Sequence, residues 1–175
     1  RSGSGSFTVS NGQATFVTNN DSLATRAEYL DDYSCTVVMK NTDSIDNGRI
    51  AINIGESKPS CLGYGTNNNI TSGIFRVIIM PTAIRWFENN ATQNQVDVAT
   101  GISKTDFNTI TFEVRDLVYT LTVNNKLIFT HELNNETFTK AGQILFCKAD
   151  NGGAGVSYVF DSIKVKGFET ETHNV

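Results

Sequence analysis

The chain contains few of the residues that build metal sites, and no apolar run long enough to cross a membrane. Its 175 residues include 3 cysteines, 2 histidines and 2 prolines. Apolar runs such as Val77 to Met80 fall far short of the roughly 18 residues that a membrane-spanning helix needs. The cysteines, Cys35, Cys61 and Cys147, show no CxxC or Cys/His spacing. We therefore expect neither insertion into a membrane nor a structural zinc site.

Charged residues are also scarce, at 18% of the chain, and the net charge at pH 7 is -4 with a pI near 5.1. The lysines and arginines form no cluster along the sequence. Proteins that bind nucleic acid or anionic lipid present such clusters, because phosphate groups dominate those contacts. The charge pattern therefore argues against nucleic acid and against an anionic membrane surface as partners.

Neither the cysteines nor the glycosylation sequons define a cellular compartment. Cys147 ends the apolar run ILFC and is expected to be a small buried side chain. A Cys35–Cys61 disulfide stays open, because spacing alone does not establish a pairing. The number of N-x-S/T sequons is close to chance for a chain this rich in Asn, Ser and Thr, so it says little about glycosylation. The sequons lie at Asn20, Asn69, Asn90 and Asn135.

The length and the ends of the chain indicate one domain with short appendages. A chain of 175 residues can bury one well-packed core and is short for two. The opening RSGSGS has no apolar segment of a signal peptide, so residues 1–5 are expected to be a linker or a cloning remnant. Residues 6–168 are expected to form the domain and residues 169–175 a solvated tail. We expect the domain to be part of a larger secreted or cell-surface protein.

The last third of the chain, Asn108 to Gly167, has the pattern of a β-meander. Turn signals at Arg115-Asp116, Asn124-Asn125 and Asn134-Asn135 separate its runs. Alternation of apolar and polar residues between such signals indicates half-buried antiparallel strands. The alternating apolar positions are Ile110, Phe112 and Val114, then Tyr119, Leu121 and Val123, then Leu127 and Phe129.

The rest of the chain reads as further short strands. Asn11-Gly12 predicts a type I′ hairpin near the start. Strands are predicted for Tyr33 to Lys40, Arg49 to Ile54, Ile74 to Met80 and Ala83 to Glu88, with polar stretches at Gly55 to Gly73 and Asn89 to Asp106. The best helical candidate, Ser22 to Asp31, is weak. The predicted fold class is therefore all-β, a two-sheet antiparallel sandwich (jelly roll) with little or no helix.

The order of these elements resembles concanavalin A-like (laminin G-like) jelly-roll domains. The resemblance covers most of residues 6–168 and is carried by the runs FTVSNGQATFVT, YLDDYSCTVVMK, FNTITFEVRDLVYTLTVNNKLIF and GAGVSYVFDSIKVKG. That superfamily includes carbohydrate-binding modules, lectins, glycoside hydrolases, polysaccharide lyases and receptor-binding domains. The resemblance implies a fold and leaves the function to the site.

Asp161 is the one acidic residue of the closing strand. The inward positions Tyr158, Phe160, Ile163 and Val165 are in phase only if a β-bulge occurs at Asp161-Ser162. Related sandwich modules often hold a structural Ca²⁺ between terminal strands, so the resemblance implies that Asp161 could ligate calcium together with backbone carbonyls of the first hairpin. In the favoured alternative, Asp161 accepts backbone hydrogen bonds at the bulge.

The carboxylates and histidines do not form an evident catalytic pair in the sequence. Glycosidases place two carboxylates on either side of the sugar, but Glu113 and Asp116 are expected on opposite faces or in a turn. Glu169 and Glu171 fall in the tail. His131 is expected to be a solvated residue at a strand edge. We therefore predict a domain that is not an enzyme, with a polysaccharide lyase or glycoside hydrolase as the third reading.

Sugar binding needs less: an aromatic ring and planar polar groups. Trp86, the only tryptophan, is flanked by Arg85, and Tyr64 lies in the Gly/Asn-rich loop LGYGTNNN. The predicted ligand-binding residues are Trp86, Arg85, Arg76, Tyr64, Asn67, Asn68 and Asn69. For Trp86 the opposing reading is a core residue that shares a face with Ile84. The predicted function is binding of a glycan or polysaccharide.

A protein-binding adhesion or receptor domain is the second reading. The run Ile74 to Met80 is apolar on both alternating faces. Covering loops on an outer sheet face would explain this pattern, and so would an interface for a protein partner.

Overall fold

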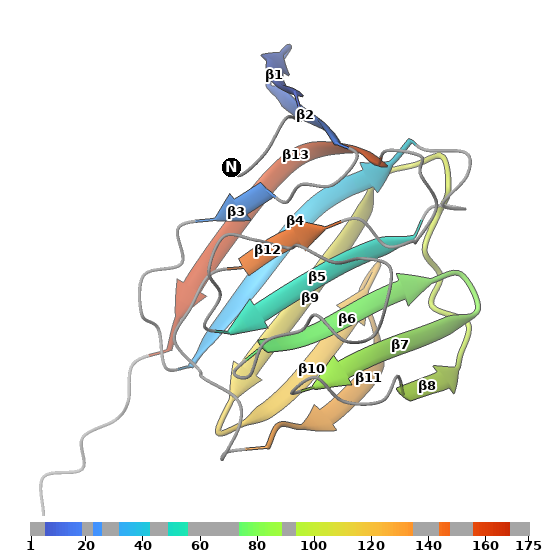
Figure 1. Cartoon of the computed structure of the whole chain (residues 1–175), viewed down its shortest axis with the longest axis vertical. Helices are drawn as coiled ribbons and strands as arrows, with labels where there is room; N and C mark the ends of the chain where they lie inside the picture. Colours follow the sequence, from blue (N-terminus) through green and yellow to red (C-terminus); the bar gives the residue numbers. More distant parts are fainter. Residues whose placement is uncertain are drawn as a thin grey trace, which may run out of the picture.

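A computed structural model describes residues 6–18, 23–25, 32–42, 49–55, 74–88, 94–134, 144–147 and 156–168. These residues form β-strands, turns and connecting segments and contain no helix. The strands build two antiparallel sheets that pack face to face (Figure 1). The predicted all-β, two-sheet sandwich is therefore confirmed.

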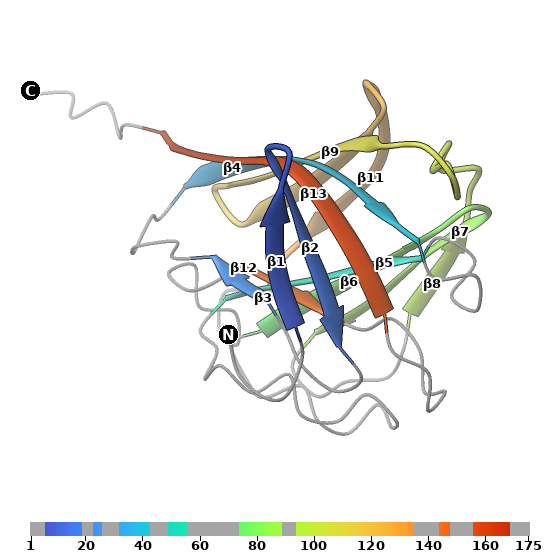
Figure 2. The ribbon, with the colours of Figure 1, turned by 90° about the horizontal axis from the view of Figure 1, so that it is seen from above.

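One sheet has seven strands and the other has six, and Figure 2 shows them as two layers. In spatial order the first sheet contains β1 (Ser6–Ser10), β2 (Gln13–Thr18), β13 (Val156–Gly167), β4 (Tyr33–Asn41), β9 (Asn108–Arg115), β10 (Val118–Val123) and β11 (Lys126–Glu132). The second contains β3 (Leu23–Thr25), β12 (Ile144–Cys147), β5 (Ile50–Gly55), β6 (Ile74–Met80), β7 (Ala83–Glu88) and β8 (Asn94–Asp97).

The core lies between the sheets and follows the period of two that strands impose on their side chains. In β4, buried and half-buried residues alternate without interruption along the nine residues of the strand. The same alternation holds in β9 until its last residue. Fully buried members of the core include Phe16, Cys35, Met39, Ile52, Phe75, Ile79, Phe112, Tyr119, Phe146 and Tyr158.

The predicted hairpin turns have the backbone that tight antiparallel connections require. Asn11 and Gly12 have φ of 51° and 76°, and Asn124 and Asn125 have φ of 49° and 66°. Positive φ at both central residues defines a type I′ turn, and Asn and Gly tolerate it best. The turn between β9 and β10 is shifted by one residue from Arg115-Asp116, because Asp116 and Leu117 occupy the two positive-φ positions.

Four sequence expectations need correction in detail. The polar stretch after Glu88 contains a strand, β8, that its exposed residues concealed. The helical candidate near Ser22 includes the strand β3. Leu127 is 60% exposed, because a register shift after Leu121 disrupts the alternation in β11. Val165 is exposed, although it lies opposite the buried Cys35.

The predicted bulge at Asp161 is present. The pairing of β13 with β4 runs from Phe160↔Met39 directly to Ser162↔Val38, so Asp161 is the extra residue. The shift lets Phe160 stay in the core and lets Ile163 pack against its edge. The side chain of Asp161 is exposed.

A buried asparagine holds the connection between β8 and β9. Asn108 is fully buried, and its Oδ1 accepts a hydrogen bond from the Ser103 backbone N–H at 2.7 Å. Its Nδ2 donates to the carbonyl oxygens of Ser103 and Asp106 at 3.0 and 3.2 Å. Oδ1 also accepts a bond from Asn124 Nδ2 at 3.2 Å. One side chain thus ties the connection to the turn between β10 and β11.

We expect Asn108→Ala to lower the free energy of unfolding by about 3 kcal/mol. The substitution leaves buried backbone donors and acceptors without partners, and each such group costs about 1–3 kcal/mol. Urea denaturation monitored by tryptophan fluorescence measures the change. Lys126→Ala, at an exposed position beside the turn between β10 and β11, is the control. Equal effects of the two substitutions would contradict the anchoring role of Asn108.

Cys35, Tyr33 and Tyr119 are ionisable side chains buried in the core around β4. Burial raises the pKa of the Cys35 thiol from 9.0 to about 12. Burial, and secondarily Cys35, raises the pKa of Tyr33 well above 10.0. Burial raises the pKa of Tyr119 in the same direction, with smaller contributions from Tyr33 and Cys35. Cys35 carries a free thiol, so it forms no disulfide here; Cys61 lies outside the described residues.

These shifts predict a loss of stability in alkali. Each of these groups has a higher pKa in the folded protein than in the unfolded chain. Below about pH 9 both states keep the protons, so the free energy of unfolding does not change. Above that pH the unfolded chain releases protons that the folded chain retains, so the free energy of unfolding falls. The free energy of unfolding then falls by up to about 4 kcal/mol per pH unit when all three groups ionise on unfolding. Urea denaturation between about pH 8 and pH 11 measures it. Tyr33→Phe should reduce the slope, and a flat profile would contradict the shifts.

Candidate functional site

The residues predicted to bind sugar do not all lie on one face of the molecule. Arg85 and Trp86 are neighbours in β7, so their side chains lie on opposite faces of the six-stranded sheet. Arg76 in β6 lies opposite Phe87, which places it on the outer face together with Arg85. Tyr64 lies outside the described residues. The two arginines are therefore together, and Trp86 is apart from them.

Other predicted positions also lie outside the described residues. This holds for the loop amides Asn67, Asn68 and Asn69, for Cys61, for the acidic pair of the tail, and for all four sequons. The linker and the tail, residues 1–5 and 169–175, belong to the same group. Their predicted roles stay predictions.

On the outer face of the six-stranded sheet, the side chains at β8 are polar and exposed, whereas those at β6 are buried. Arg85 Nε donates to Gln95 Oε1 at 2.7 Å, and Gln95 Nε2 donates to Asp97 Oδ1 at 2.7 Å. Arg76 is only 8% exposed, and its guanidinium lies 5.7 Å from the centre of the Phe87 ring. Of the two arginines, Arg85 is therefore the more accessible to a ligand on this face.

The strand β6 is buried on both faces, as its apolar sequence indicates. Phe75, Val77 and Ile79 face the core, and Ile78 and Met80 on the outer face are also buried. These two side chains therefore do not form an exposed apolar patch.

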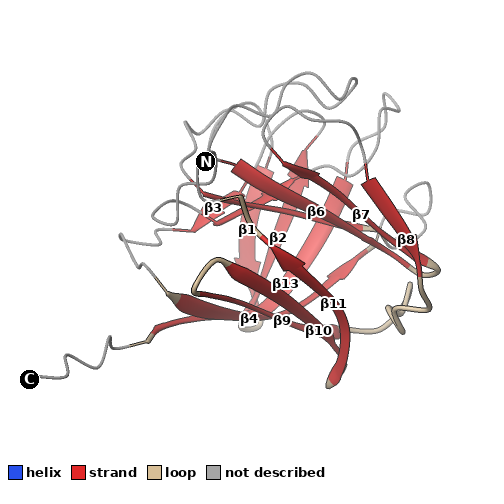
Figure 3. Cartoon of the chain, turned by 90° about the horizontal axis from the view of Figure 1, so that it is seen from below, coloured by secondary structure: helices blue, strands red, loops and turns tan. Residues whose placement is uncertain are grey.

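Trp86 lies between the sheets, close to the open edge of the sandwich. It shares the inner face with Ile84 and is only partly buried. The edge strands at this side are β8 in one sheet and β11 in the other (Figure 3). The indole ring packs against Phe129 at 4.9 Å and against His131 at 5.6 Å between ring centres, both from β11. The ring therefore packs on the core, as the opposing reading predicted, and keeps some exposure. Its role in sugar binding stays a prediction.

His131 is not the solvated edge residue that the sequence predicted. Its ring is stacked on Phe75 with centres 5.2 Å apart and planes 6° from parallel, and it also stacks on Phe129 at 6.0 Å. Phe75 belongs to the six-stranded sheet, so the imidazole is inserted between the sheets. The expectation failed because Thr130 and Glu132 on either side are exposed, which makes the local sequence look like a strand end in water.

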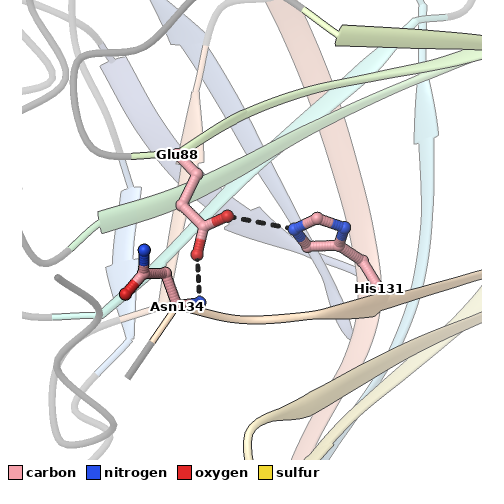
Figure 4. A network of polar contacts seen from close by, with 3 residues as sticks. All are labelled: Glu88, His131 and Asn134. Atoms are coloured by element: carbon pink, nitrogen blue, oxygen red, sulfur yellow. Dashed lines mark hydrogen bonds and ion pairs between the residues drawn. The ribbon is translucent and has the colours of Figure 1, made fainter. Parts of the chain in front are cut away.

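A carboxylate from the opposite sheet holds His131 in place (Figure 4). Glu88 Oε2 lies 3.0 Å from His131 Nε2. The backbone N–H of Asn134 donates to Glu88 Oε1 at 2.6 Å. The side chains of His131 and Glu88 are 24% and 17% exposed. The end of β7 is thus fastened to the end of β11, and one histidine and one carboxylate do form a pair.

An open pocket lies beside this pair. It has a volume of about 470 Å³, and its described lining includes Glu88, Leu117, Glu132, Leu133 and Asn134. Two carboxylates and an amide line it together with two leucines. Such groups can accept and donate hydrogen bonds to hydroxyl groups of a ligand, and the leucines offer apolar contact.

The arrangement supports two kinds of chemistry. A partly exposed indole beside carboxylate and amide groups can hold a sugar ring. A carboxylate hydrogen-bonded to an imidazole can also orient it and move a proton, as in general acid–base catalysis. Glu113 and Asp116 do not face one another, as expected from their spacing, since Glu113 lies on the outer face of the seven-stranded sheet and Asp116 lies in a turn.

The calcium prediction at Asp161 is not tested by the described residues. They contain no group of three or more His, Cys, Asp or Glu side chains that could hold a metal ion. Backbone carbonyl ligands of the kind predicted are outside that criterion. In the same part of the chain, no helix is long and apolar enough to cross a membrane.

Sequence reasoning missed Glu88, His131 and Asn134 as a group. Their strand phase was readable, because Glu88 follows Ile84 and Trp86, and His131 follows Phe129, at intervals of two. The proximity was not readable, because 43 residues separate Glu88 from His131 and the contact crosses from one sheet to the other.

Comparison with known proteins identifies the fold. No protein-family model matches the sequence, and no curated protein matches it. The carbohydrate-binding module CBM66 from Bacillus subtilis is similar in structure, with a TM-score of 0.64 at 14% identity, over 94% of this chain and 92% of that one.

Two solved enzymes are similar as well. The alginate lyase A1-II′ of polysaccharide lyase family 7 has a TM-score of 0.57 at 12% identity, over 91% of this chain and 82% of that one. The Crh5 transglycosylase has a TM-score of 0.61 at 14% identity, over 95% of this chain and 77% of that one. At such identities the likeness shows the fold alone. The chain has the concanavalin A-like jelly-roll fold.

Proposed function

We propose that the domain binds a glycan or polysaccharide without cleaving it, at the open edge between β8 and β11. The carrying observation is the cluster of Trp86, His131 and Glu88 beside an open pocket with a polar lining. Similarity to a carbohydrate-binding module supports this reading, as does similarity to enzymes that act on polysaccharides. We further propose that the domain works outside the cell, as part of a larger secreted or cell-surface protein.

In this proposal the partly exposed Trp86 ring contacts the apolar face of a sugar. The pocket supplies hydrogen bonds through Glu132 and Asn134, which are both exposed. Glu88 is already bonded to His131 and to the backbone of Asn134, so its carboxylate is fixed before a ligand arrives. A fixed acceptor costs less entropy on binding than a mobile one.

The predicted contribution of the outer face remains a separate proposal. Arg85 and Arg76 would bind a ligand on the side of the six-stranded sheet opposite to Trp86. Tyr64 and Asn67–Asn69 stay predicted ligand-binding residues, because they lie outside the described residues. A single sugar ring cannot contact both faces. Substitutions on each face therefore distinguish the two locations.

Catalysis is the second candidate function, and the Glu88–His131 pair is the observation that favours it. A lyase needs a base near the acidic carbon of the sugar and a group that neutralises the neighbouring carboxylate. Glu88 and His131 provide one acid–base pair, and the lining described here contains no lysine or arginine. Binding is therefore the function that the geometry supports better. A protein-binding role through Ile78 and Met80 has less support, because both side chains are buried.

We expect Trp86→Ala to weaken binding to the glycan that a glycan array identifies by about tenfold or more, since a lost aromatic contact costs on the order of 1 kcal/mol beyond its buried area. Isothermal titration calorimetry measures the loss. Arg85→Ala changes the adjacent side chain on the opposite face. Thr130→Ala, next to His131 and exposed, is the neutral control.

Comparison of Trp86→Ala with Arg85→Ala locates the binding site as well as measuring the loss of affinity. Loss with Trp86→Ala alone supports the open edge, whereas loss with Arg85→Ala alone moves the ligand to the outer face. Absence of binding to every glycan on the array would contradict the proposed function. Trp86→Phe retains an aromatic ring and should retain part of the affinity, which separates stacking from misfolding.

We expect the unaltered domain to release no new reducing ends and no unsaturated uronates from polysaccharides. Colorimetric detection of reducing ends and ultraviolet absorbance of the unsaturated product measure the two reactions. If product does form, and Glu88→Gln abolishes it while binding persists, the domain is an enzyme that uses this pair. That outcome would replace the first proposal by the second.

A further inference from the structure

The strand β1 is an exposed edge of the seven-stranded sheet, at the end away from β11 (Figure 1). Among the described strands it is hydrogen-bonded to β2 alone, and all five of its residues are exposed. Phe7 pairs with Phe16 and Val9 pairs with Ala14, so both continue the inner apolar face of the sheet. Phe7 is 42% exposed and Val9 is 68% exposed. Such an edge offers backbone donors and acceptors beside an apolar row.

The other three edges carry features that discourage pairing, and β1 carries none of them. The edge strands β3 and β8 have only three and four residues, and β8 ends on the charged Asp97. The edge strand β11 has an irregular register after Leu121 and charged ends at Lys126 and Glu132. Short length, bulges and charges are the usual means of protecting an edge. The sequence of β1, SFTVS, has no charge and no proline.

The sequence of β1 is also complementary to itself. An antiparallel pair centred on Thr8 places Ser6 against Ser10 and Phe7 against Val9 of the other copy. On the inner face, each aromatic ring then meets a β-branched side chain, a favourable cross-strand pair. On the other face, hydroxyl groups meet hydroxyl groups. No charge is buried and no side chain meets an unsuitable partner.

We propose that β1 pairs with β1 of a second copy of this chain around a two-fold axis at Thr8. The two seven-stranded sheets then form one continuous antiparallel sheet. An isologous contact of this kind closes on itself, so it gives a dimer and no longer assembly. It brings Phe7 of each copy into contact with Val9 of the other, so it reduces the exposure of both side chains.

The dimer leaves the candidate glycan site open. The pairing strand and the strand β11, which carries His131, are the two opposite ends of the same sheet. Each dimer thus presents two open edges, one at either end of the joined sheet. Pairing through five residues per copy buries less area than a standard interface. The association is therefore weak and reversible, with a dissociation constant in the micromolar range or higher.

The proposed dimer is tested by measuring the average molecular mass of the protein in solution as a function of its concentration. Sedimentation equilibrium between about 10 µM and 1 mM, the range suited to a small interface, should show a monomer–dimer equilibrium. Val9→Lys places a charge opposite Phe7 of the partner and should weaken association by about tenfold or more. Leu127→Lys is the matched control, an equally exposed apolar side chain on the edge strand β11, and should leave association unaltered. A monomer at every concentration, or equal effects of the two substitutions, overturns the proposal.

A cross-linking experiment tests the register. Thr8→Cys brings two thiols together at the axis, where opposed Cα atoms lie about 4.5–5.5 Å apart and within disulfide range. Ser10→Cys places its two thiols roughly 14 Å apart along the strands. Under mild oxidation Thr8→Cys should give a disulfide-linked dimer well above the background of the unaltered chain, and Ser10→Cys should not. Equal cross-linking of both variants overturns the two-fold pairing.

Discussion

Packing of aromatic rings between the two sheets is the interaction on which the rest of the molecule depends. Phe75 of the six-stranded sheet packs against Tyr119 and His131 of the seven-stranded sheet, with ring centres 4.9 and 5.2 Å apart. Tyr119 in turn contacts Phe112 and Phe129. Rings of this size fill the space between sheets about 10 Å apart. Because this cluster positions His131, it also decides where Glu88 can reach a partner.

The cluster and the polar site are continuous. Toward the end of β7 the inner face changes from aromatic to polar, because Glu88 lies two residues after Trp86 and therefore on the same face. The Asn134 backbone N–H donates a hydrogen bond to the Glu88 carboxylate, which ties the end of β7 to the segment after β11. A partly buried polar pair whose members are hydrogen-bonded to each other and to the backbone is well positioned for recognition of a ligand. At the end of the seven-stranded sheet opposite to β11, Phe7 and Val9 of β1 remain exposed.

The same jelly roll carries a binding module, a lyase and a transglycosylase among the similar solved structures. The scaffold alone therefore does not separate binding from catalysis. In this chain the separation depends on what surrounds the Glu88–His131 pair. The described lining offers acceptors and apolar contacts, which favour a hydroxyl-rich ligand, and it lacks the cationic group that a lyase would place beside a uronate.

The sequence alone determined the fold class, most strand boundaries, the type I′ turn at Asn11-Gly12 and the bulge at Asp161, because these follow from local periodicity and from the residues that tolerate positive φ. It also contained the fact that Arg85 and Trp86 occupy opposite faces, since neighbours in a strand always do. Only the tertiary structure decided that Glu88 meets His131. Their contact joins strands of different sheets, 43 residues apart, and no local pattern records which strand ends lie together. The exposure of β1 likewise depends on how far the second sheet extends, which is a property of the packed molecule.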